Sequence, residues 1–141
     1  MKHLTFTVFI LLVCTLAIQA QEIDFKKGTV FLDGKAVLSY KVENRATEFT
    51  LYKLNTNEEV AFIIDYENQT VGYRKDDYYK INFISIGLKL ESSNILGTWK
   101  KVVKWFFKND LFNNNAELNK DKVKVFVEKY DENISQRTIK G

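Results

Sequence analysis

The chain of 141 residues contains no proline, one cysteine and one histidine. The cysteine, Cys14, and the histidine, His3, both lie in the first twenty residues, so residues 21–141 contain neither type. That region can therefore form no disulfide, and it has no thiolate or imidazole to act as nucleophile, general base or zinc ligand. We expect packing alone to hold the fold together, with no metal site and no cofactor.

The first twenty residues have the pattern of a secretory signal peptide. Lys2 is followed by an apolar run from Leu4 to Ile18 and then by Ala20, a small residue after which cleavage is expected. The apolar run is shorter than the ~20 residues that a membrane span needs, so stable membrane anchoring is not expected. The chain resembles small exported proteins of Gram-negative bacteria in its junction and composition, which predicts a periplasmic or extracellular location.

Residues 21–141 are expected to form a single globular domain, since a chain of this length can bury one core but not two. They hold 20 basic and 18 acidic residues, for a net charge of +2. The basic excess is concentrated in residues 96–141, which hold 10 basic and 6 acidic residues. This excess is modest beside that of nucleic-acid binders, so a nucleic-acid partner is not expected.

Alternating apolar residues between positions 22 and 91 predict an antiparallel sheet of five or six strands. The sharpest local signal is Asp33-Gly34 between two apolar runs, which predicts a hairpin with a type I′ turn. Residues 60–64 are apolar in both parities and predict an interior strand. Residues 78–91 carry the longest strand signal, with or without a β-bulge near Phe83 or Ile84.

Two helices are expected after the strands, at about 95–108 and about 120–130. The first has an apolar side centred on Trp99, which should anchor the helix on the sheet, and Ser92, Ser93 and Asn94 are its candidate N-caps. The second has a candidate cap in Asn119, although alternation of valine and lysine there also permits a strand. The predicted class is α+β, with two C-terminal helices packed on the antiparallel sheet.

One candidate binding site is the densest aromatic and charged segment, residues 73–80. Tyrosine combines an apolar ring with a polar tip, and arginine stacks on such rings, so the segment suits a sugar, peptide or protein partner. The alternative is a solvated loop that leads into an edge strand. The candidate residues are Tyr73, Arg74, Tyr78 and Tyr79.

The other candidate is a ridge of lysines on the first helix, opposite its apolar side. Its members, Lys100, Lys101, Lys104 and Lys108, fall within about 100° of one another on a helical wheel. Such a ridge could bind an anionic surface, or it could be the ordinary solvated side of the helix.

No catalytic motif is present. The sequence lacks a P-loop, a dinucleotide glycine fingerprint, an EF-hand loop and a Gly-x-Ser-x-Gly elbow. Adjacent carboxylates such as Glu58-Glu59 would point to opposite faces of a strand, which does not suit a glycosidase-like pair. We therefore expect a binding or interaction module for an unknown protein, glycan or small ligand. The alternatives are a small hydrolase using Asp, Glu, Tyr or Lys, and a carrier of an apolar ligand between sheet and helix.

Overall fold

The computed structural model describes residues 21–66, 77–95 and 97–137. The expected signal peptide, residues 1–20, and the candidate site residues Tyr73 and Arg74 lie outside these ranges. None of the helices in the described part of the chain is long and apolar enough to cross a membrane.

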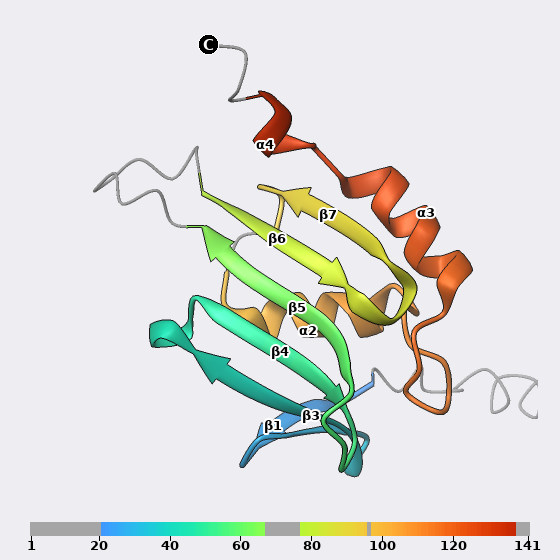
Figure 1. The fold of residues 1–141 in the computed structure, drawn as a ribbon. Helices are drawn as coiled ribbons and strands as arrows, with labels where there is room; N and C mark the ends of the chain where they lie inside the picture. Colours follow the sequence, from blue (N-terminus) through green and yellow to red (C-terminus); the bar gives the residue numbers. More distant parts are fainter. Residues whose placement is uncertain (1–20, 67–76, 96, 138–141) are drawn as a thin grey trace, which may run out of the picture.

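Seven strands form one antiparallel sheet in which each strand pairs with the next along the chain (Figure 1). A short 3₁₀ turn, η1 (Asn44–Ala46), joins the third and fourth strands. The strands are β1 (Ile23–Lys26), β2 (Thr29–Leu32), β3 (Lys35–Glu43), β4 (Glu48–Lys53), β5 (Glu59–Tyr66), β6 (Tyr78–Phe83) and β7 (Leu88–Ser92). The predicted α+β class with an antiparallel sheet is confirmed, with one strand more than expected.

The additional strand arises because residues 78–91 form a hairpin rather than one long strand. The chain turns at η2 (Ile84–Ile86) and at Gly87, which has a φ of 69° and donates its N–H to the carbonyl of Phe83 at 2.9 Å. The pairing then places Ile81 opposite Leu90, so both apolar parities meet on one face of the sheet. The turn brings them together, so no bulge is needed.

The predicted hairpin at Asp33-Gly34 is confirmed. Both residues have positive φ, 49° and 79°, and the flanking Leu32 and Lys35 are paired, as a two-residue type I′ turn requires. A second turn with the same features, Lys27-Gly28, joins β1 to β2.

The helices are α2 (Trp99–Lys108), α3 (Lys120–Tyr130) and a short α4 (Ile134–Arg137). Asn119 caps α3 as predicted, because its side-chain oxygen accepts the N–H of Lys122 at 3.2 Å. The predicted caps of the first helix are wrong. That helix begins at Trp99 after Thr98, whose side chain makes no capping hydrogen bond. Residues 92–94 instead form hydrogen bonds with Glu132.

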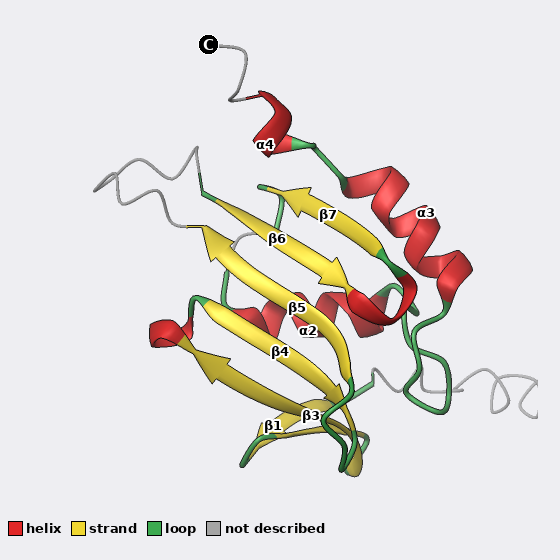
Figure 2. Cartoon of the chain, viewed as in Figure 1, coloured by secondary structure: helices red, strands yellow, loops and turns green. Residues whose placement is uncertain are grey.

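The core lies between one face of the sheet and α2, which crosses behind the strands in Figure 2. Trp99, as expected, packs its ring against this face. Sheet and helix contribute apolar side chains that are at most 1 % exposed, namely Val30, Leu38, Phe49, Leu51, Ala61, Ile63, Ile81, Phe83 and Leu90 from the strands and Val102, Val103 and Phe106 from α2.

The helix α3 lies beside β7 and extends the core at that edge (Figure 1). Phe126 of α3 is 3 % exposed, and its ring contacts the rings of Phe83 and Trp105. Burial of this ring explains why the valine and lysine alternation in α3 forms a helix, since the helical spacing places Val123 and Phe126 on the same inward side.

Candidate functional site

The face of the sheet opposite α2 is not covered by any helix of the described residues (Figure 1). In β3 to β7 every second side chain points to this side, and the register aligns them in rows, such as Thr50 beside Phe62 and Phe62 beside Asn82. Figure 1 shows β4, β5 and β6 from this side, and no helix of the described residues lies over them. We call this surface the open face.

The centre of the open face is apolar and aromatic. Phe62 and Ile64 project from β5 and are only partly buried, although β5 is an interior strand. Tyr66, 37 % exposed, stacks on Tyr78 with ring centroids 5.0 Å apart and planes within 12°. Tyr52 of β4, which is partly buried, adds a third tyrosine on the same side.

Charged residues lie directly beside this centre, since Glu48 and Lys80 are the cross-strand neighbours of Ile64, and also at the ends of the rows. Lys41 pairs with Glu43 at 2.7 Å near one end of the rows, and Lys80 pairs with Glu91 at 3.3 Å near the other. An apolar aromatic centre within a charged border is the usual composition of a protein-binding surface.

Burial and hydrogen bonding determine the ionisation of two groups on this face. Burial raises the pKa of Glu91, but hydrogen bonds from the N–H and hydroxyl of Ser135 and the ion pair with Lys80 outweigh it, so the pKa is lowered overall. Burial, and then the nearby charge of Glu91, raise the pKa of Tyr78. The Tyr78 hydroxyl therefore remains a neutral donor at neutral pH.

The structure separates the residues of the predicted tyrosine cluster. Tyr78 lies on the open face, whereas Tyr79 is 4 % exposed on the opposite side and donates its hydroxyl hydrogen to the carbonyl of Gly97. Neighbouring residues of a strand point to opposite faces, so these two tyrosines cannot contribute to one surface. Tyr79 instead fixes the loop that precedes α2.

The four predicted lysines are all exposed on the outer side of α2. Lys100 also lies over two aromatic rings, with its Nζ 5.9 Å from the ring centre of Phe25 and 5.5 Å from that of Trp99. Because α2 covers the face opposite the open face, this lysine ridge and the open face lie on opposite sides of the sheet (Figure 2).

A polar clasp holds the C-terminal segment against the β7 edge. The carboxylate of Glu132 accepts hydrogen bonds from the Ser93 N–H at 2.6 Å, the Ser92 hydroxyl at 3.1 Å and the Asn94 side chain at 3.3 Å. Asp131 accepts the N–H of Glu91 at 2.9 Å. Burial raises the pKa of Glu132, but the hydrogen bonds outweigh it and the pKa is lowered. Residues 92–94 therefore make these hydrogen bonds to Glu132 and not to the N-terminus of α2.

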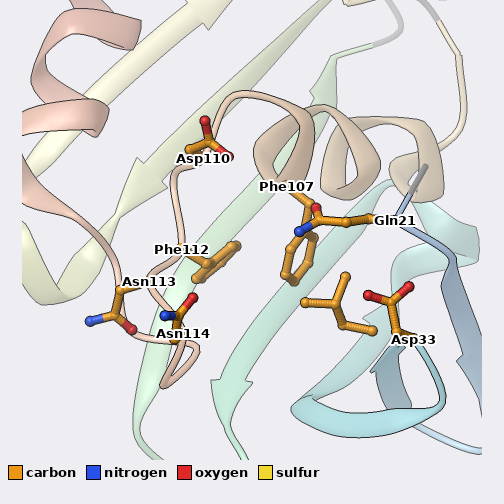
Figure 3. A pocket seen from close by; sticks show the side chains of 8 residues that line it. Gln21, Asp33, Phe107, Asp110, Phe112, Asn113 and Asn114 are labelled. Atoms are coloured by element: carbon orange, nitrogen blue, oxygen red, sulfur yellow. The ribbon is translucent and has the colours of Figure 1, made fainter. Parts of the chain in front are cut away.

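A pocket of about 260 Å³ lies between the β2–β3 turn and the loop after α2 (Figure 3). Its floor includes the rings of Phe107 and Phe112, whose centroids are 4.9 Å apart. Its polar lining consists of Gln21, Asp33, Asp110, Asn113 and Asn114. The volume is below the roughly 300–1,000 Å³ of most small-molecule sites.

The sequence did not reveal the central residues of the open face. The apolar parities of residues 60–64 predicted burial on both sides, but only Val60, Ala61 and Ile63 are buried in the core, while Phe62 and Ile64 lie partly buried on the open face. Within the described ranges there is no group of three or more His, Cys, Asp or Glu residues that could hold a metal ion.

Comparison with known proteins gives no relative to draw on: no protein-family model, no curated protein and no solved structure matches the chain.

Proposed function

We propose that the protein is an exported binding module and that the open face of its sheet docks a protein partner. The observation that carries the proposal is the outward position of Phe62 and Ile64 on an interior strand that no described helix covers. Partly buried aromatic and aliphatic side chains at the centre of a surface gain free energy when a partner removes them from water.

The shape and composition of the face favour a protein over a small molecule. The apolar side chains run along β5, from Phe62 through Ile64 to Tyr66, and Tyr78 of β6 extends them where it pairs with Tyr66. Tyrosine and phenylalanine are enriched at the centres of protein interfaces, and the border pairs, Lys41 with Glu43 and Lys80 with Glu91, would form the polar rim.

The alternative functions have weaker support. A hydrolase needs a free carboxylate with a raised pKa or a polarised nucleophile, whereas Glu91 and Glu132 accept several hydrogen bonds from the chain and have lowered pKa values. A carrier needs an enclosed apolar cavity, whereas the pocket at Phe107 and Phe112 is lined mostly by polar residues.

Site-specific photocrosslinking in the native host tests the proposal. A photoreactive residue at Ile64 should give a discrete crosslinked protein, whereas the same residue at Lys122, which is exposed on α3, should not. Adding Phe62→Glu to the Ile64 probe should abolish the product while the chain remains folded by circular dichroism. The same product from both probe positions, or its persistence with Phe62→Glu, would contradict docking on this face.

A further inference from the structure

The lysine ridge of α2, defined by Lys100, Lys101, Lys104 and Lys108, places four exposed lysines on one side of a ten-residue helix. The helix runs Trp-Lys-Lys-Val-Val-Lys-Trp-Phe-Phe-Lys and contains no acidic residue. Its lysines fall within about 100° of the helical wheel, so all four project in one direction.

Neighbouring acids do not neutralise the ridge. Among the described residues none of the four lysines forms an ion pair, since the ion-paired lysines there are Lys26, Lys41, Lys53 and Lys80. The charge of Lys104 helps to lower the pKa of Asp24, but Asp24 forms its ion pair with Lys26, at 2.9 Å. Asp110 follows the helix and is exposed, and it forms no ion pair with the four lysines among the described residues. The ridge therefore presents a local excess of positive charge.

The helix α3 provides an internal comparison. It also carries four exposed lysines, Lys120, Lys122, Lys124 and Lys129. At about 100° per residue these fall on two opposite sides of the helix, with Asp121 and Glu128 between them. The two helices thus differ in the arrangement of their lysines and in their acids, and not in the number of lysines.

We propose that the lysine ridge of α2 binds an anionic phospholipid surface. Lysines near such a surface are attracted by its negative potential, and each strengthens binding by on the order of fivefold at moderate salt. The apolar side of α2 is buried against the sheet, so the contact is peripheral and electrostatic, without insertion of side chains. The ridge and the open face are on opposite sides of the sheet, so a protein partner could be held at the lipid surface.

Vesicle binding tests this proposal with the exported protein and matched variants. The ridge variant changes Lys100, Lys101, Lys104 and Lys108 to glutamine, and the control variant changes Lys120, Lys122, Lys124 and Lys129 to glutamine. Both variants lose the same charge at exposed positions, and thermal unfolding checks that both remain folded. Co-sedimentation is measured with phosphatidylglycerol–phosphatidylcholine vesicles and with pure phosphatidylcholine vesicles across a salt series.

We expect the wild-type and control proteins to bind the anionic vesicles, and the ridge variant to bind at least about a hundredfold more weakly at low salt. Binding should be lost towards 1 M salt, where the Debye length is about 3 Å, and should be absent with phosphatidylcholine alone.

Equal losses of binding in both variants would overturn the proposal, because net charge and not the ridge would be responsible. Unchanged binding of the ridge variant would overturn it, as would retention on a soluble polyanion without vesicle binding. These outcomes do not depend on the open face, so this proposal can fail while the proposed protein partner stands.

Discussion

The ring of Trp99 stacks on the ring of Phe49, with centroids 4.3 Å apart and planes within 17°. This contact joins the first residue of α2 to β4, the central strand of the sheet, and Phe25 and Tyr40 complete the aromatic cluster around the indole. The helix has no side-chain cap at its N-terminus. Aromatic packing therefore fixes the position where α2 begins.

Replacing Trp99 with alanine should lower the free energy of unfolding by about 3 kcal/mol, because the change removes apolar contacts and leaves a cavity beside Phe49. The ring is partly exposed, which places the loss at the low end for a tryptophan. Denaturant unfolding provides the measurement, and Lys101→Ala on the same helix should change stability by less than about 0.5 kcal/mol. A loss below about 1 kcal/mol for Trp99→Ala would show that the stack does not anchor the helix.

The clasp at Glu132 should make stability depend on pH. Its pKa is lowered in the folded state, so its contribution is present above the unfolded value of about 4.3 and is lost as the pH falls through the folded value. We expect the free energy of unfolding to fall with acidification below about pH 5, and Glu132→Gln to weaken this dependence. Glu128→Gln, on the exposed side of α3, is the matched control. Parallel pH profiles for wild type and Glu132→Gln would contradict the clasp.

There is space for a side chain at Gly87, but the backbone conformation of this residue is unfavourable for residues other than glycine. A Cβ there would meet no atom within 4 Å, yet the residue has a φ of 69°. Gly87→Ala should therefore lower the free energy of unfolding by about 1 kcal/mol. Gly87→Asn should cost less, since asparagine adopts this conformation more readily. Equal losses in chemical denaturation would show that conformation is not the cause.

Local signals in the sequence predicted much of the fold. Asp33-Gly34 specifies its turn through the positive φ of both residues, and Asn119 caps α3 with its own side chain. Both features depend only on residues a few positions apart in the sequence. The apolar side of α2 was likewise visible in its helical spacing.

The sequence-based predictions were wrong where contacts between residues far apart in the chain determine the structure. Ser92, Ser93 and Asn94 have the chemistry of N-caps, but the carboxylate of Glu132, 38 to 40 positions away, takes their hydrogen bonds. Gly87 alone did not distinguish a hairpin from a strand with a bulge. The open face was missed because an apolar side chain at position 62 or 64 looks the same in sequence whether a helix covers it or not.

Ile63 and Ile64 offer the sharpest test of the open face, since they are adjacent and chemically identical. Ile63 is 1 % exposed and faces α2, so Ile63→Ala should lower the free energy of unfolding by about 3 kcal/mol. Ile64 is only partly buried on the open face, so Ile64→Ala should lower it by about 1 kcal/mol. Both values come from denaturant unfolding of the isolated protein. Equal losses would mean that another part of the chain covers Ile64, and the docking surface would then have to be sought elsewhere. A small loss of stability in Ile64→Ala, combined with weaker capture of the partner when this variant carries the photoreactive residue at Tyr66 of the open face, would identify a side chain retained for binding more than for folding.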